Sequence, residues 1–174
     1  AGTGNRGLKV FFNKNKLSVP DFRRYINYYD YNTESLYYDE SNKRWKVGCL
    51  YLPDNGNRVV SFVNGISTYN GGTHCNHVID TVLKPILAEI KKKNKDIKIS
   101  QNILRENLIF FIDSTIENPA FSSQTKDTLT TKVAKFGSSY KPTDVFIKKI
   151  SKCGIVNQVI ELAKFKETSK LKKN

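Results

Sequence analysis

One continuous apolar run constrains the fold of this 174-residue chain more than any other feature of its sequence. Residues 108–112 read Leu-Ile-Phe-Phe-Ile, without the alternation of polar and apolar residues that marks a strand wetted on one face. Runs of this kind are typical of strands buried at the centre of a sheet. With 39% hydrophobic residues, the chain is long enough to bury a core around such a strand, and we interpret it as one domain.

Several β-prone segments precede this run. Residues 8–12 and 16–19 flank an Asn-rich break at 13–15, which predicts a β-hairpin. Three further strands are predicted at 36–38, 45–52 and 58–63. The turn at 54–57, Asp-Asn-Gly-Asn, tolerates positive φ at little cost, so these three strands predict an antiparallel meander.

Two helices are predicted before the central run. Asp21 can cap the first, in which one face carries Phe22, Tyr25, Ile26 and Tyr29. Thr73 can cap the second, whose apolar stripe recurs every four residues at Val78, Val82, Ile86 and Ile90. Pro85 lies inside that helix and predicts a kink, because proline removes a backbone hydrogen bond. The helix is expected to end in the lysine-rich run 91–95.

The second half of the chain combines helices with a long irregular segment. A helical turn is predicted near 101–104, and residues 115–139 show little periodicity, which at this length is typical of functional or disordered loops. A helix starting at 142–144 ends at Gly154, the expected C-cap residue, and carries Val145, Ile147 and Ile150. The last helix, about 155–173, becomes basic towards its end and is expected to bury Ile155, Val156, Val159, Ile160, Leu162 and Ala163.

Charge and cysteine usage narrow the class of protein. The chain carries 29 Lys and Arg against 16 Asp and Glu, a formal net charge of +13. Such an excess is commonest in proteins that bind anionic polymers, although a basic surface also serves solubility alone. Cys49, Cys75 and Cys153 lack Cys-x-x-Cys spacing, so we expect a reducing compartment and no disulfide framework. No run of about 18 apolar residues and no secretory signal occurs, so a soluble protein is expected.

Two common kinds of site find little support in the motifs. The His-Cys-Asn-His run at 74–77 lacks a second ligand cluster, and only His74 and His77 would align on a helix. We therefore interpret it as a helix start and not as a zinc site. No Walker or Gly-x-Gly-x-x-Gly loop occurs, so this chain is not expected to bind ATP tightly alone. The run 91–95 gathers four lysines, which suit the phosphates of a duplex or an ordinary solvated helix end.

The segment 116–126, Ile-Glu-Asn-Pro-Ala-Phe-Ser-Ser-Gln-Thr-Lys, resembles the switch loop of type IIA DNA topoisomerases. Further blocks resemble the eukaryotic enzymes in the same order and at similar spacing, namely 8–29, 61–64, 71–74, 136–138, 154–156 and 163–166. The resemblance covers nearly the whole chain. It identifies the chain as similar to the transducer segment of these ATP-driven enzymes.

The resemblance implies an α+β, ribosomal-protein-like fold: a mostly antiparallel four-stranded sheet with helices on one side, an N-terminal hairpin and a long C-terminal helix. It also implies that Lys126 reaches the γ-phosphate of ATP bound in a preceding ATPase domain, with Gln124 and Thr125 beside it. Lysine suits this role because it is a compact charge on a long flexible stem. The loop, anchored at 118–119 and 136–137, is expected to stay mobile until another domain presents ATP.

The same resemblance relates Lys91, Lys92, Lys93 and Lys95 to a basic loop that touches the DNA segment to be cleaved. The implied partners are duplex DNA, bound without sequence preference, the protein's own ATPase domain and the DNA-cleavage core. The full-length enzyme is expected to be a nuclear homodimer that uses ATP and Mg²⁺. The fragment itself is expected to be a monomer that binds neither cofactor alone.

Residues 1–7 are interpreted as a cloning scar or linker and 8–174 as the transducer domain. Within it, 8–60 forms the entry hairpin, helix and strands, and 61–174 forms the transducer core and C-terminal helices. The implied function is to relay nucleotide state to the DNA gate of an isomerase during duplex strand passage, and no catalytic residue is nominated in this chain. The alternative is a self-contained basic nucleic-acid-binding domain of similar fold, which has no use for a nucleotide-sensing loop.

Overall fold

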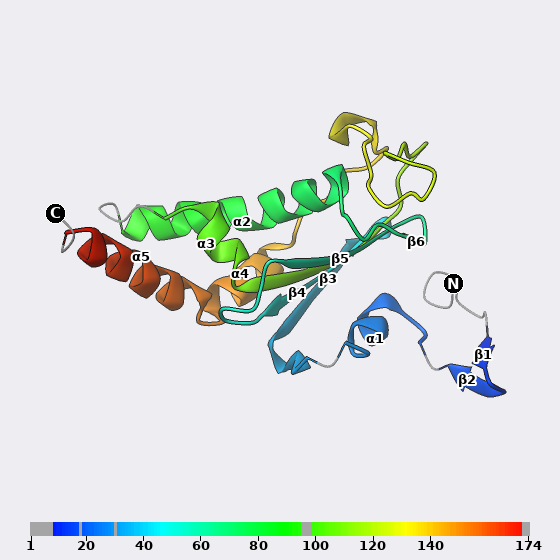
Figure 1. Ribbon diagram of the computed structural model, residues 1–174, viewed down its shortest axis with the longest axis horizontal. Helices are drawn as coiled ribbons and strands as arrows, with labels where there is room; N and C mark the ends of the chain where they lie inside the picture. Colours follow the sequence, from blue (N-terminus) through cyan, green and yellow to red (C-terminus); the bar gives the residue numbers. More distant parts are fainter. Residues whose placement is uncertain (1–8, 18, 30, 95–98, 172–174) are drawn as a thin grey trace.

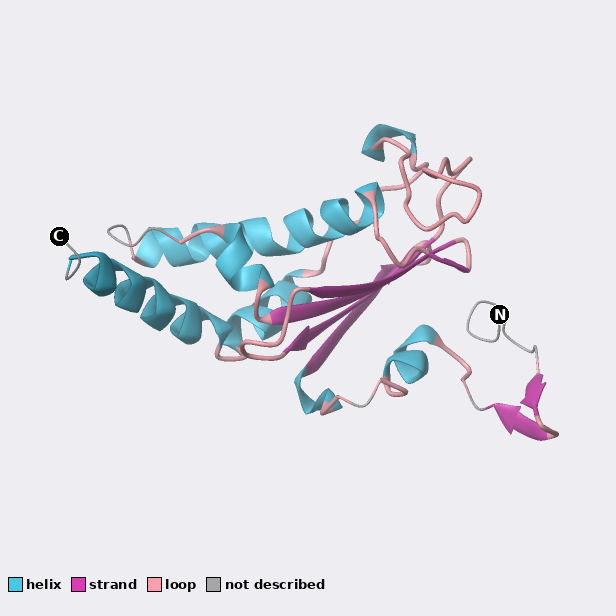
Figure 2. Cartoon of the chain, viewed as in Figure 1, coloured by secondary structure: helices cyan, strands magenta, loops and turns pink. Residues whose placement is uncertain are grey.

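The computed structural model describes residues 9–17, 19–29, 31–94 and 99–171. Within them the chain forms a five-stranded sheet, a two-stranded hairpin, five helices and two 3-10 turns (Figures 1 and 2). The strands are β1 (Val10–Phe12), β2 (Asn15–Leu17), β3 (Leu36–Asn42), β4 (Trp45–Tyr51), β5 (Arg58–Val63), β6 (Ile66–Ser67) and β7 (Leu108–Ser114). The helices are α1 (Phe22–Ile26), α2 (Thr73–Lys93), α3 (Gln101–Arg105), α4 (Asp144–Lys152) and α5 (Ile155–Leu171), and the 3-10 turns are η1 (Thr33–Ser35) and η2 (Val133–Lys135). None of the described helices is long and apolar enough to span a membrane.

β7 is the middle strand of the sheet, whose order is β3-β4-β7-β5-β6. Both of its faces are covered, and the five residues of the apolar run are at most 1% exposed. Leu108, Phe110 and Ile112 belong to one apolar cluster, whereas Ile109 and Phe111 belong to another. The prediction of a buried central strand is confirmed.

The two faces of the sheet are covered unequally. The larger cluster lies under α2 to α5, and α2 buries in it the predicted stripe of Val78, Val82, Ile86 and Ile90. α1 lies on the opposite face of the sheet (Figure 1). There, Phe22 and Ile26 pack with Leu50, Ile109 and Phe111. Most helices therefore lie on one side, as expected, but α1 covers the other.

The predicted meander is wrong in one respect, because β5 does not lie beside β4. β7 lies between them, antiparallel to β4 and parallel to β5. The turn joining β4 to β5 crosses the start of β7, where Gly56 N–H donates to Glu106 O at 2.9 Å and Asn57 N–H donates to Leu108 O at 2.9 Å. A Cβ on Gly56 would lie 2.3 Å from the Leu108 nitrogen, so glycine permits this crossing. β6 pairs with β5 and makes five strands instead of the expected four.

The predicted N-terminal hairpin and the cap of the first helix are confirmed, but that helix is shorter than predicted. β1 and β2 pair through a turn in which Asn13 and Lys14 have φ of 47° and 64°, the conformation of a two-residue hairpin turn. Asp21 caps α1, because its carboxylate accepts from the Arg24 N–H at 2.7 Å. α1 ends at Ile26, earlier than its aromatic stripe suggested.

The start of α2 differs from the prediction. Gly72, and not Thr73, occupies the N-cap position. Because Thr73 lies inside the first turn, its hydroxyl is free to donate to Thr131 O at 2.7 Å. The helix runs through the exposed Pro85 without dividing, and the kink expected there stays a prediction.

α4 begins and ends as predicted but presents a different face. Thr143 caps it, and Gly154 follows it with a φ of +96°. Val145 was expected in the core, yet it is 61% exposed. Phe146 is buried instead, because it shares a helix face with Ile150, four residues further on.

Candidate functional site

Residues 115–139 form a long loop that leaves the end of β7 and returns before α4 (Figure 1). Two limbs of the loop run antiparallel to each other. Ser122 N–H donates to Thr128 O at 3.0 Å, and Thr130 N–H donates to Ala120 O at 2.9 Å. The predicted irregular segment therefore has a defined shape, a short ladder ending in a tip. That the loop moves until ATP is present stays a prediction.

The tip, residues 123–127, carries Gln124, Thr125 and Lys126, all of them exposed. Lys126 has a φ of +59°, and its N–H donates to Ser123 O at 3.1 Å. Left-handed backbone is uncommon for lysine. The turn holds Lys126 in this conformation and so sets the direction in which its side chain leaves the loop. No carboxylate of the described residues forms an ion pair with Lys126, which leaves its ammonium group available to an anion.

The returning limb is docked against the start of α2. Leu129 N–H donates to Gly71 O at 3.0 Å, and Thr73 N–H donates to Leu129 O at 3.1 Å, as between parallel strands. Gly72 lies between these bonds with a φ of +135°, and a Cβ there would be 2.3 Å from Leu129 O. Close backbone approach to the loop thus explains Gly72, whereas Gly71 meets only the Cys75 side chain and is favoured by its φ of +72°.

The base of the loop is fixed to the core. Phe136 is fully buried, and its ring centroid lies 5.9 Å from that of Trp45 and 6.1 Å from that of His77. On the outgoing side, the Arg44 guanidinium donates to the Glu117 carboxylate at 2.7 Å. The anchor predicted at the returning end of the loop is confirmed.

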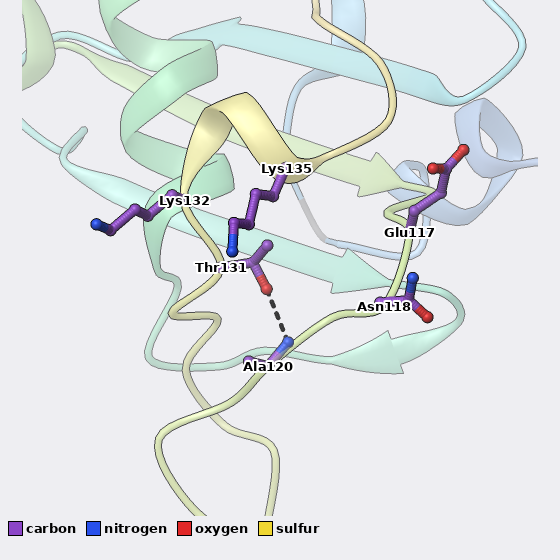
Figure 3. A pocket seen from close by; sticks show the side chains of 6 residues that line it. All are labelled: Glu117, Asn118, Ala120, Thr131, Lys132 and Lys135. Atoms are coloured by element: carbon purple, nitrogen blue, oxygen red, sulfur yellow. Dashed lines mark hydrogen bonds between the residues drawn. The ribbon is translucent and has the colours of Figure 1, made fainter.

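A cavity of about 630 Å³ lies at the base of the limbs. It is lined by Glu117, Asn118, Ala120, Thr131, Lys132 and Lys135 (Figure 3). Lys135 extends towards Thr131, whose hydroxyl accepts from the Ala120 N–H at 2.7 Å, whereas Lys132 and Glu117 point outwards. The tip residues do not line this cavity, so it is separate from the predicted ATP contact.

The two histidines of the 74–77 run serve the interior where α2 begins. His74 is fully buried, its Nε2 lies 3.2 Å from Thr68 Oγ1, and burial lowers its pKa to about 4. His77 Nε2 accepts from the Tyr140 N–H at 3.3 Å, and burial lowers the pKa of this imidazole too. Both rings are therefore neutral at physiological pH.

The lysine run lies at the other end of α2. Lys91 and Lys92 are exposed in its last turn, Lys93 is its last residue, and Asn94 caps it. Lys95 lies outside the described residues. At 1.5 Å per residue, the 21 residues of α2 span roughly 31 Å, so the run and the loop lie at opposite ends of this helix (Figure 1). The structure does not bring the two predicted sites together.

Sequence reasoning missed the residues that hold the tip. Tyr69 and Asn70 both donate hydrogen bonds to Asp127, directly after Lys126. Tyr69 and Asn70 lie 58 and 57 positions before Asp127 in the sequence and belong to no motif. The only signal was their place beside two blocks that resemble one family.

Comparison with known proteins gives the family. The family model described as DNA gyrase B matches residues 12–174. The chain is 41% identical over 177 residues to DNA topoisomerase 2 of Drosophila melanogaster, covering 97% of this chain and 12% of that protein. It is 39% identical to the probable DNA topoisomerase 2 of Dictyostelium discoideum, covering 98% and 12%. The chain thus spans about an eighth of the length of these curated relatives.

Solved structures share the fold. The crystal structure of the ATPase region of Saccharomyces cerevisiae topoisomerase II superposes with a TM-score of 0.84 at 34% identity, over 94% of this chain and 42% of that one. The structure of the ATPase and transducer domains of DNA topoisomerase II from Balamuthia mandrillaris gives 0.88 at 34% identity, over 96% and 42%. The chain therefore belongs to the DNA gyrase B family and is similar to part of the ATPase region of topoisomerase II.

Proposed function

We propose that this chain is the transducer segment of an ATP-dependent type IIA DNA topoisomerase, with the ribosomal-protein-like fold of such segments. It relays the nucleotide state of an adjoining ATPase domain to the DNA gate during strand passage. In support, the chain covers 42% of a structure that contains ATPase and transducer domains. The observation that carries the proposal is the exposed tip with Lys126, held on a hydrogen-bonded ladder that is docked on α2.

Lys126 binds the γ-phosphate of ATP held by the ATPase domain, with Gln124 and Thr125 beside it. The ammonium group is exposed and has no ion pair with any described carboxylate. Because the chain has no Walker loop, it supplies one part of a site. The phosphate cradle and the Mg²⁺ that accompanies ATP belong to the other domain. Charge-assisted bonds to the γ-phosphate are lost on hydrolysis, which makes the contact sensitive to nucleotide state.

The docked limb supplies the relay. Leu129 is bonded on both sides to the residues that open α2, so a displacement of the tip acts on this helix. α2 packs along the sheet through its four-residue stripe and moves as a rigid element. A switch of this kind needs two arrangements whose balance the γ-phosphate contact biases.

The test of the proposal is Lys126→Ala in the full-length protein. ATP turnover is expected to fall about 10- to 100-fold, because a hydrogen bond to a charged group contributes roughly 1.5–3 kcal/mol. Lys132→Ala removes another exposed lysine from the same loop and is expected to stay within about two-fold. Unchanged turnover in Lys126→Ala contradicts the proposal.

We also propose that Lys91, Lys92, Lys93 and Lys95 contact duplex DNA without reading its sequence. Lys91 and Lys92 are exposed in the last turn of α2, and lysines neutralise phosphates without direct base readout. By the same proposal, the full-length protein is a nuclear homodimer that also contains the DNA-cleavage core, and this segment alone is monomeric.

A self-contained nucleic-acid-binding domain is the weaker proposal. The relatives of this chain are proteins about eight times its length, in which it matches only one part. Such a domain also gives no role to the Lys126 tip.

A further inference from the structure

The carboxylate of Asp127 connects the tip to the turn that precedes α2. Its Oδ2 accepts from Asn70 Nδ2 at 3.2 Å and from the Tyr69 hydroxyl at 3.4 Å. Its Oδ1 accepts from Ser123 Oγ at 3.0 Å and from Ser122 Oγ at 3.2 Å. One oxygen therefore holds the loop itself, and the other holds the body of the protein.

The backbone strengthens this connection. The Asp127 carbonyl accepts from the Asn70 N–H at 3.1 Å, so the two residues are joined by one backbone bond and one side-chain bond. The hydrogen bond from Ser123 and, to a smaller extent, that from Ser122 hold the pKa of Asp127 below its usual value. The carboxylate is therefore ionised at neutral pH. The turn at 69–70 leads directly into the glycine pair that opens α2.

The position of Lys126 depends on this neighbour. Lys126 has left-handed backbone, which a lysine keeps only where surrounding contacts hold it. The other tip bonds, from Lys126 N–H to Ser123 O and between Ser123 Oγ and Thr125 Oγ1, stay within the tip. Among the described residues, Asp127 alone ties the tip to a segment outside the loop.

We propose that Asp127 is a positioning residue for Lys126. Its hydrogen bonds hold the tip to the turn at 69–70, which places the Lys126 ammonium group against the γ-phosphate and fixes its position relative to α2. The inference rests on the proposed contact between Lys126 and ATP. It adds that this contact is transmitted to α2 through Tyr69 and Asn70 as well as through the docked limb.

Asp127→Asn in the full-length protein is the first test. The substitution keeps the size of the side chain but removes its charge and turns one of its two acceptor oxygens into a donor, so the four hydrogen bonds that Asp127 accepts cannot all be kept. Affinity for a non-hydrolysable ATP analogue is expected to fall about 10-fold, whereas affinity for ADP, which lacks the γ-phosphate, stays within about two-fold. Asp54→Asn makes the same chemical change in another exposed turn, and it is expected to bind both nucleotides normally.

Exchanging the partners distinguishes positioning from general damage. The double variant Asn70→Asp, Asp127→Asn reverses donor and acceptor across the same contact and is expected to recover most of the analogue affinity. Asn70→Asp alone brings two carboxylates together and is expected to be at least as impaired as Asp127→Asn. Amide hydrogen exchange of the 174-residue chain gives a readout without nucleotide. Lys126 and Leu129 are expected to exchange about 5- to 10-fold faster in Asp127→Asn and to recover in the double variant.

The outcomes separate this inference from the proposed function. Normal analogue affinity in Asp127→Asn, equal losses for the analogue and ADP, or no recovery in the double variant overturns the positioning role. Impaired Lys126→Ala beside normal Asp127→Asn overturns this inference alone. Normal turnover in Lys126→Ala overturns the proposed function instead.

Discussion

Lysines lie at both ends of α2, on a hydrogen-bonded loop tip at one end and in an exposed helix turn at the other. At the N-terminal end, a single lysine lies on a tip that is bonded to its own loop, and the loop in turn is bonded to Gly71 and Thr73. At the C-terminal end, Lys91 and Lys92 project from an exposed helix turn. The loop tip fixes the direction of one ammonium group, whereas the helix turn brings several positive charges together.

The difference determines how each end responds to change. A positioned group loses its effect when one contact is removed, because a shift of about 1 Å disturbs the geometry it supplies. A cluster of exposed charges acts through its sum, so each member contributes a small and salt-dependent part.

The largest effect is expected for Gly72→Ala at the N-terminal end of α2, where the loop is docked. Its Cβ would lie 2.3 Å from a backbone oxygen of the loop, which cannot rotate away, and φ is +135°. Urea unfolding of the chain is expected to show a loss of about 3 kcal/mol. Gly65→Ala is the control, because Gly65 also has positive φ but has open space around it, and it should cost about 1 kcal/mol. Equal losses in the two variants would show that the docked limb contributes nothing.

Stability at the same end is expected to depend on pH through His74. Its pKa is about 4 when folded and about 6.5 when unfolded, so between these values the unfolded chain binds more protons. Stability is therefore complete above pH 6.5 and falls by up to about 1.4 kcal/mol per unit as the pH drops towards 4. His77, whose pKa is also lowered, adds to the slope. Denaturant titrations of wild type and His74→Gln across this range should differ in slope; parallel curves would refute the prediction.

At the C-terminal end of α2, replacing Lys91, Lys92 and Lys93 by Ala is expected to flatten the salt dependence of duplex binding. At about −0.9 per neutralised phosphate, three contacts contribute a slope of roughly −2.7. Each single replacement should change the slope by about a third of that. The control is the triple replacement by Ala of the exposed α4 residues Lys148, Lys149 and Lys152, which removes the same number of charges. If the control flattens the slope as much, the charge is diffuse and the cluster has no special place.

The smallest effect is expected at the base of the loop. Arg44 and Glu117 form an ion pair, but their side chains are 39% and 56% exposed. Arg44→Ala should therefore cost less than about 1 kcal/mol of stability, and a double-mutant cycle with Glu117→Ala should give a coupling of similar size. A larger coupling would mean that the ion pair, and not buried Phe136, holds the base.

The central strand and the stripe of α2 were predictable because their signals are local. A run of five apolar β-formers and a four-residue repeat are read from neighbours in the sequence, and burial follows from them. Val145 shows the limit of this reasoning. It is as apolar as Ile147, yet only the orientation of α4 against the sheet decides which face is buried.

By resemblance, the sequence also indicated the tip with Lys126, but it could not indicate what holds that tip. The contacts of Asp127 with Asn70 and of Leu129 with Gly72 join segments more than fifty residues apart. Hydrogen bonds of this kind depend on which backbone strands are brought side by side, and no periodicity records that.

The sequence by itself determined most of the helices and strands, the buried central strand and the lysine run 91–95, because local spacing and turn chemistry specify these. It indicated Lys126 only through the resemblance to a family. Only the tertiary structure decided that β7 lies between β4 and β5 and that the loop rests on the first residues of α2. The physical reason is that long-range pairs form where chain crossings leave backbone donors and acceptors to be satisfied. Gly56 and Gly72, which lack a Cβ, are the places where such close approach is possible.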